Sequence, residues 1–349
     1  MKTRMKKSLI VFFVSIIFLV GVSSLNPTNA QIADLEGSAT TSLDIVTTIA
    51  VPYDIVKEVA GEDANISSIV DSATDIHTFT GPTQQQINDM IAADVIFSMG
   101  ISGAEPWFQD VVDDNGLQSK VVPLADVSVD GEADPLLDGQ KNPHVWMNPE
   151  VVKKMVNQTT VKLTELDAVN QATFEANNAT FQTRLDKLLD NIDGNKTAYF
   201  DGQKVVVNHP AFFYLFNKLG LDRIESLETH SSGYTGQAAI NDIIEQINSE
   251  TGDVILITSP QHSRSDMYEI ARNTGSKIAD MSAIPGVYEH WILDDYSVPD
   301  YISMIEYCMW SLRNPQDPPE ESIPGYSIVF LTVGIGLGLL ILRKRMKIQ

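Results

Sequence analysis

The sequence predicts an α/β protein: two lobes of parallel sheet flanked by helices, joined by one long helix, with a C-terminal transmembrane helix. Short apolar runs alternate with helical patterns, and a much longer helical pattern separates two such regions. An uncharged stretch stands near the end of the chain. The 349 residues, 43% of them hydrophobic, are enough for about two domains.

The N-terminal lobe is expected over residues 43–148. Apolar runs predict its buried strands, and apolar residues at three- and four-residue spacing predict its helices. The expected strands cover 43–51, 95–99 and 121–124, and the expected helices cover 53–60, 83–92 and 107–115. Because strands and helices alternate, the sheet should be parallel and covered by helices.

A long linking helix is expected at 149–193, since Asn148-Pro149-Glu150 is a helix-start signal and apolar periodicity follows it. A break is expected near 167–170. At about 1.5 Å per residue, the helix is long enough to cross a domain. The C-terminal lobe follows at 194–313, with strands at 204–208, 254–258 and 276–279 and helices at 212–219, 236–248 and 265–273.

Both ends of the chain carry membrane-related signals. Residues 1–30 have the order of a secretory signal peptide, with an uncleaved anchor as the alternative. Residues 323–342 carry no charge over a length that crosses a bilayer, and the basic tail 343–349 is expected in the cytoplasm. Residues 31–42 and 314–322 are expected to be a tether and a linker. The bulk of the chain should then lie outside the cell, anchored in the cell membrane by a single pass.

Charge and cysteine content narrow the function. The net charge of −22 argues against nucleic-acid binding, which needs clustered Lys and Arg, and favours a cationic partner. The single cysteine, Cys308, allows no intramolecular disulfide and is expected to be a buried apolar side chain.

Four polar residues stand directly after strand or turn signals: His77, His144, His209 and Asp280. Loops after parallel strands meet at one edge of a sheet, where ligands bind, and each lobe supplies two of the four residues. Imidazoles and a carboxylate suit Zn²⁺ in a tetrahedral shell, and a closed shell favours carrying a metal over catalysis. A hydrogen-bonded structural role for each histidine is the alternative.

Several segments together resemble one family. They are 75–83 with 93–100 and 105–108, then Asn142-Pro143-His144-Val145-Trp146-Met147-Asn148-Pro149, then His209-Pro210-Ala211-Phe212 with 219–221, and 259–261 with 275–280. In this order they resemble the solute-binding subunits of zinc and manganese ABC importers, the cluster A-I metal-binding receptors. The resemblance covers residues 45–313.

The resemblance implies two four-stranded lobes bridged by a rigid helix, with metal ligands at His77, His144, His209 and Asp280. A histidine as third ligand, here His209, looks zinc-like in this family, whereas an acidic residue there looks manganese-like. The implied protein is not an enzyme, and its partners are an ABC permease and the ATPase that drives it. We expect a monomer.

The chain departs from the family pattern in several places. Many zinc-binding members carry a His-rich loop, where this chain has acidic residues: Asp126, Asp130, Glu132, Asp134 and Asp138. We expect a solvated loop there, with electrostatic steering of cations as the alternative. Residues 227–233 do not follow the pattern, and the tail helix would replace the lipidated N-terminal cysteine of bacterial members. His262 is expected in solvent, with contact to a metal ligand as the alternative.

The sequence therefore predicts an extracellular, membrane-anchored receptor that captures Zn²⁺ in the cleft between its lobes and delivers it to an ABC-type permease. A Mn²⁺ or Fe²⁺ receptor of the same family is one alternative. A metal-dependent hydrolase would need an open coordination position and a nearby base. An adhesin on the same fold is the third alternative.

Overall fold

The computed structural model describes residues 42–71, 74, 76, 78–229, 233–234, 236–286 and 298–320. The expected signal peptide (1–30), the tether up to residue 41, the membrane segment (323–342) and the basic tail (343–349) lie outside these residues.

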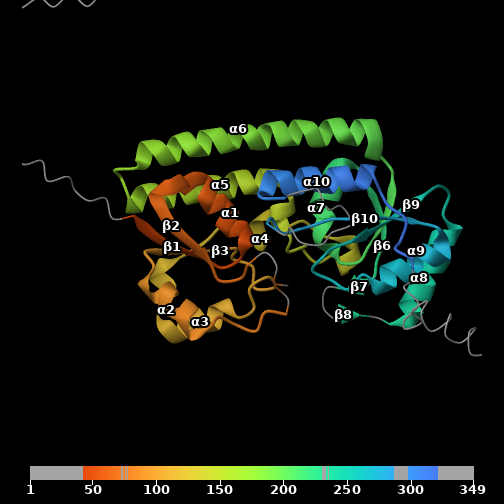
Figure 1. Cartoon of the computed structure of the whole chain (residues 1–349), viewed down its shortest axis with the longest axis horizontal. Coiled ribbons are helices and arrows are strands. Elements are labelled where there is room, and N and C mark those ends of the chain that lie inside the picture. Colours follow the sequence, from red (N-terminus) through yellow and green to blue (C-terminus); the bar gives the residue numbers. More distant parts are fainter. Residues whose placement is uncertain are drawn as a thin grey trace, which may run out of the picture. The chain divides into compact units, whose positions relative to one another are not determined.

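The N-terminal lobe is a four-stranded parallel sheet in the order β2-β1-β3-β4 (Figure 1). Its strands are β1 (Leu43–Thr47), β2 (Ala64–Ser68), β3 (Val95–Ser98) and β4 (Val121–Pro123), and its helices are α1 (Ala50–Ala60), α2 (Gln84–Ala92), α3 (Phe108–Asn115) and α4 (Val127–Asp130). All four residues of β3 are buried, as expected for a central strand covered on both faces. The parallel sheet confirms the prediction made from the alternation of strands and helices.

The C-terminal lobe has a second four-stranded parallel sheet, in the order β10-β9-β5-β6. Its strands are β5 (Lys204–Val207), β6 (Asp222–Ser226), β9 (Val254–Thr258) and β10 (Lys277–Asp280), and its helices are α7 (Phe213–Leu219), α8 (Gln237–Ser249), α9 (Ser265–Thr274) and α10 (Tyr301–Arg313). A two-residue strand pair, β7 (Glu228–Thr229) with β8 (Gly233–Tyr234), lies beyond β6 in the chain. Cys308 is buried on α10, where its thiol donates to the carbonyl of Ser282.

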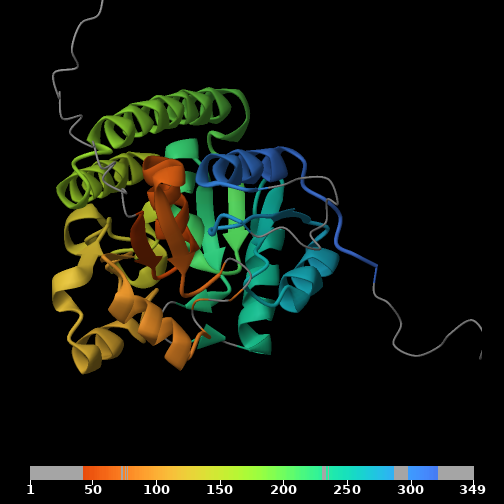
Figure 2. The same cartoon turned by 60° about the vertical axis from the view of Figure 1, so that its left-hand side comes forward.

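The linking element is a pair of helices, α5 (Pro149–Leu166) and α6 (Gln171–Asn195), rather than one long helix. Between them, the Asp167 carboxylate accepts backbone N–H bonds from Val169 and Asn170, which closes a tight turn. The two helices lie side by side (Figures 1 and 2), and α6 contacts α1 of one lobe and α7 and α10 of the other. The hairpin therefore connects the lobes through its α6 arm.

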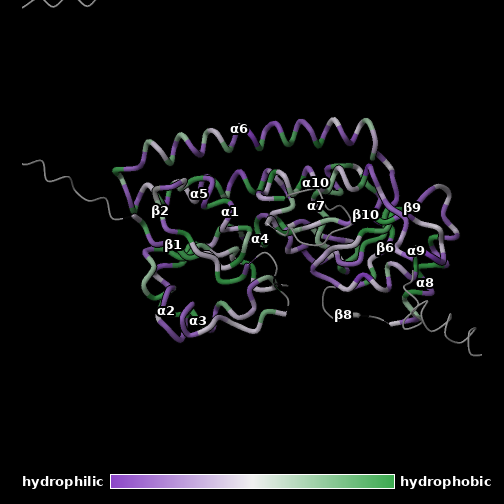
Figure 3. The backbone as a smooth tube through the Cα atoms, viewed as in Figure 1, coloured by the Kyte–Doolittle hydropathy of each residue, from purple (hydrophilic) through white to green (hydrophobic). Residues whose placement is uncertain are grey.

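The expected transmembrane helix requires a correction. Among the residues that the structure describes, no helix is both long and apolar enough to cross a membrane. Two described helices, α5 and α6, have 18 residues or more. Hydrophilic and hydrophobic residues are mixed along α6 (Figure 3), because only one of its faces packs into the core. The architecture found is two α/β lobes and a helical hairpin. Residues 323–342, where the hydropathy pattern predicts the anchor, lie outside the described part.

The two lobes share one apolar core. A single cluster of buried side chains includes Phe97 of the first sheet, Phe181 of α6 and Val207 of the second sheet. A separate cluster fills the space between the second sheet and helices α8 and α9. Because the larger cluster includes residues of both sheets and of α6, the two lobes pack as parts of one core.

Candidate metal centre

Loops from both lobes meet around a small cavity. His209 follows β5 and His262 follows β9, while His144 directly precedes the short 3₁₀ helix Val145–Met147. All three histidines line the cavity, whose volume is about 20 Å³. That is enough for one or two water-sized spheres. The loops after β5 and β9 therefore meet at an edge where parallel strands end, with the His144 segment beside them.

Asn142 fixes which nitrogen of His144 faces the cavity. The Asn142 amide NH₂ donates to Asp134 (2.8 Å) and to the Pro210 carbonyl (2.9 Å), so its oxygen is the acceptor on the other side. That oxygen lies 2.9 Å from His144 Nδ1 and also accepts the His144 backbone N–H. Nδ1 of His144 must then carry the proton, which leaves the lone pair on Nε2.

Glu228 fixes which nitrogen of His209 faces the cavity. Its Oε2 lies 3.2 Å from His209 Nδ1. A carboxylate can only accept, so the proton of the neutral imidazole sits on Nδ1 and the lone pair on Nε2. The Nε2 atoms of His144 and His209 face each other at 3.2 Å.

Two nitrogen lone pairs at this distance repel each other unless a cation or a proton lies between them. In a tetrahedral zinc site with Zn–N bonds of about 2.0–2.1 Å, neighbouring ligand nitrogens lie about 3.3–3.4 Å apart. The spacing of the two Nε2 atoms is close to this edge length. The pair is therefore suited to share one metal ion.

A buried network supports the His144 loop. Asp134, fully buried, forms an ion pair with Arg223 of the C-terminal lobe, with atoms 2.5 Å apart. The Trp146 indole N–H donates to the Ala283 carbonyl at 2.7 Å, and the Tyr301 hydroxyl donates to the Trp146 carbonyl. Because these bonds join segments distant in the chain, they restrict the position of His144.

The acidic segment is only partly the solvated loop that we expected. Asp134 is buried and holds Asn142, while Asp130 pairs with Lys154 of α5. At the start of α4, hydrogen bonds from the Ser128 side chain and from the Ser128 N–H lower the pKa of the exposed Asp126 carboxyl group. The segment contains structural contacts that its composition does not reveal.

Asp280 lies apart from the two histidines. It ends β10 as expected and is buried, but its Oδ1 accepts the Thr258 hydroxyl (2.7 Å) and its Oδ2 pairs with Arg264 (2.8 Å). Burial raises the pKa of Asp280, and the nearby Arg264 charge opposes that rise. Asp280 does not appear among the residues lining the cavity. His77 lies outside the described residues.

Two further side chains at the site were not predicted as metal-binding residues. Glu228 and His262, with His209, offer ligand atoms that all lie within 4.8 Å of one another. The His262 side chain is 14% exposed, so it is not in open solvent as expected. Glu228 lies in the segment 227–233, which departs from the family pattern. The family motifs therefore could not identify it as a site residue.

The chain is similar to known metal-transport proteins. The profile of ZnuA, described as zinc-uptake complex component A, periplasmic, matches residues 45–314. The manganese-binding lipoprotein MntA of Halalkalibacterium halodurans is 26% identical over 249 residues, covering 70% of this chain and 79% of that protein. The iron ABC transporter substrate-binding lipoprotein MtsA of Streptococcus pyogenes serotype M1 is 26% identical over 279 residues, covering 76% and 85%.

A solved structure has the same fold. The periplasmic zinc-binding protein TroA from Treponema pallidum superposes with a TM-score of 0.65 at 17% identity, covering 77% of this chain and 96% of that chain. These similar proteins are named for three different metals.

Proposed function

Because the chain belongs to the ZnuA family of metal-uptake components, we propose that it is an extracellular receptor that captures Zn²⁺ and delivers it to an ABC permease and its ATPase. Members of this family are substrate-binding receptors of metal ABC transporters and not enzymes, as the sequence predicts. This excludes the alternative of a metal-dependent hydrolase. Since relatives are named lipoproteins, we place the receptor at the outer surface of the cell membrane.

One observation carries the proposal: the Nε2 atoms of His144 and His209 lie 3.2 Å apart. Both tautomers follow from acceptors on Nδ1, so the arrangement is prepared before any ion arrives. For these two histidines, such preorganisation lowers the cost of ordering the ligands when the ion binds.

The proposed ligands are His77, His144, His209 and Asp280. The close approach of His144 to His209 supports two of these four ligands. Asp280 would have to exchange its contact with Arg264 for the metal. The acidic surface of the chain, with its net charge of −22, would attract cations over a longer range.

Nitrogen-rich coordination favours Zn²⁺ over Mn²⁺, which prefers oxygen ligands. To test the metal, the protein is purified without added metal, its metal content is measured, and Zn²⁺, Mn²⁺ and Fe²⁺ compete for it. We expect zinc to displace manganese at equal concentrations. Equal or tighter manganese binding would contradict the zinc assignment and leave the receptor role intact.

The histidines themselves are tested by substitution. We expect H144A and H209A each to weaken Zn²⁺ binding at least about a hundredfold, since each removes one of a few ligands that share the binding energy. Unchanged zinc affinity in both variants would contradict the receptor function. The adhesin alternative stays a hypothesis, and zinc-independent attachment to a surface would favour it.

A further inference from the structure

His262 is arranged like His209, although the sequence motifs single out only His209. The two imidazole rings stack, with centroids 4.4 Å apart and planes inclined by 21°. Both rings turn Nδ1 toward the same atom, Oε2 of Glu228, at 3.2 Å from His209 and 3.4 Å from His262. One carboxylate thus faces both rings from the same side.

The shared carboxylate decides the tautomer of His262 as well. A negative oxygen beside Nδ1 favours the proton on that nitrogen, which leaves the lone pair on Nε2 at the far side of the ring. The rings are nearly parallel, so both Nε2 atoms lie on the side away from Glu228. His262 also lines the same cavity as His144 and His209.

The state of Asp280 adds a second argument. Its two carboxylate oxygens are engaged by Thr258 and Arg264. Moving a buried carboxylate off a guanidinium has a considerable cost in free energy. His262 already lines the cavity, so its coordination does not require breaking the pair between Asp280 and Arg264.

We propose that His262 is a ligand of the bound cation through Nε2, and that Glu228 is a positioning residue that holds both His209 and His262. The inference rests on the proposed function and extends its ligand set. An added imidazole makes the site richer in nitrogen and shifts its preference further toward Zn²⁺ and away from Mn²⁺.

The direct test is H262N, in which the asparagine amide can replace the Nδ1–H donor to Glu228 but has no group at the position of Nε2. We expect Zn²⁺ affinity, measured by calorimetric titration, to fall at least about tenfold. The matched control is N273A, which alters an exposed residue of α9 outside the cavity lining and should bind like wild type. Wild-type affinity in H262N would overturn the proposal.

X-ray absorption of the zinc-loaded protein gives an independent count of imidazole ligands. We expect one fewer in H262N than in wild type. An equal count in both proteins would overturn the role of His262 whatever the affinities are. This result would leave the receptor function standing. The receptor function would be contradicted only if H144A and H209A also bound zinc with wild-type affinity.

Glu228 is tested by comparing E228A with E228Q. Glutamine keeps one acceptor oxygen for an Nδ1–H, whereas alanine keeps none, so E228A should lose about ten- to a hundredfold in zinc affinity and E228Q clearly less. Thermal unfolding of the metal-free variants shows whether each is folded. Equal losses in the two folded variants, or no loss in E228A, would contradict the positioning role.

Discussion

At the residue scale, groups hydrogen-bonded to the proposed histidine ligands determine how those ligands can bind a metal. Asn142 and Glu228 each place an acceptor on Nδ1 of an imidazole. A histidine has two possible ligand nitrogens, and the acceptor selects which one keeps its lone pair. Sequence motifs identify the histidines. The tautomers depend on contacts such as that between Glu228 and His209, which are 19 positions apart.

We expect N142A to weaken Zn²⁺ binding about ten- to a hundredfold, because His144 loses the acceptor that fixes its tautomer and ring orientation. The matched control is N148A. Asn148 is also a buried asparagine near His144, but its side chain accepts the Glu150 N–H at the start of α5. Its loss should cost about 1 kcal/mol of stability and leave zinc affinity unchanged. Calorimetric titration of both variants with Zn²⁺ tests this prediction. Equal zinc affinities of N142A and N148A would contradict it.

At the scale of elements, the sequence predicted central strands better than edge strands. β9 was predicted with its bounds, because all five of its residues are apolar or buried. The edge strands β2 and β6 were missed, since ANISS and DRIES contain few apolar residues and are mostly half-buried or exposed. The break expected near 167–170 is the turn between α5 and α6. Helical periodicity could not show that the two helices fold back on each other, because either arrangement buries one apolar stripe.

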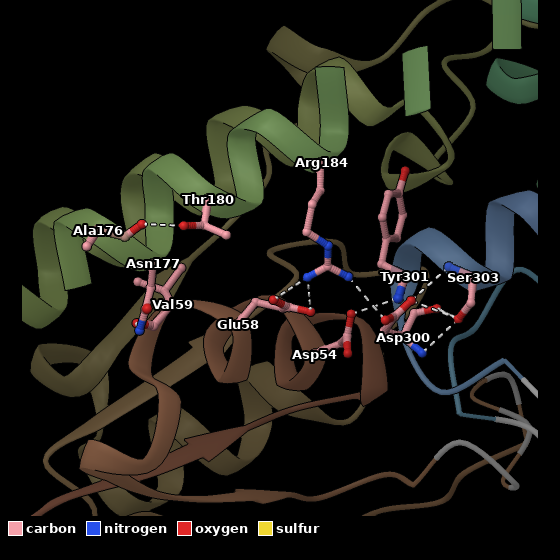
Figure 4. Close-up of polar contacts among 10 residues, drawn as sticks. All are labelled: Asp54, Glu58, Val59, Ala176, Asn177, Thr180, Arg184, Asp300, Tyr301 and Ser303. Carbon is pink, nitrogen blue, oxygen red and sulfur yellow. Dashed lines mark hydrogen bonds and ion pairs between the residues drawn. The ribbon is translucent and has the colours of Figure 1, made fainter. Parts of the chain in front are cut away.

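Three helices that are distant in sequence are joined by polar contacts (Figure 4). Arg184 of α6 donates to both oxygens of Glu58 on α1 and pairs with Asp300, the N-cap of α10. Beside them, Asp54 of α1 accepts the Tyr301 backbone N–H at 2.8 Å. These contacts link the N-terminal lobe to the last helix of the C-terminal lobe.

Asp54 should make stability depend on pH. Burial raises its pKa from 3.8 to about 7, and the charges of Asp300 and Glu58 act in the same direction, against the Tyr301 N–H bond. The folded protein therefore keeps a proton that the unfolded chain releases. The resulting stabilisation is complete below about pH 4 and is lost as pH rises to about 7, by up to about 4 kcal/mol.

D54N keeps an oxygen for the Tyr301 N–H and has no proton to lose. We expect D54N to gain stability relative to wild type as pH rises from about 4 to about 8. Urea unfolding of both proteins with a chelator present measures this difference, in which titrating groups that do not interact with Asp54 cancel. A difference that is the same at both pH values would contradict the role of Asp54.

At the scale of the whole molecule, the candidate site depends on how the two lobes share a core. Strand-end positions predicted that His144 and His209 would approach each other, and they lie 3.2 Å apart between atoms although 65 positions separate them. The same rule placed Asp280 correctly at the end of β10 but could not foresee its pairing with Arg264. That pairing depends on the side-chain packing around the sheet, which periodicity does not encode.

A shared core also predicts how zinc changes stability. Because one apolar cluster includes both sheets and the hairpin, the described part should unfold in a single transition. Zinc at about a hundred times its dissociation constant should add about 2.7 kcal/mol, which raises the midpoint by about 5 °C. Manganese at the same concentration should raise it less, since it binds nitrogen ligands more weakly. Calorimetric scans of the metal-free protein with each ion check this. Two separate transitions, with only one moved by zinc, would show that the lobes are not coupled through the core.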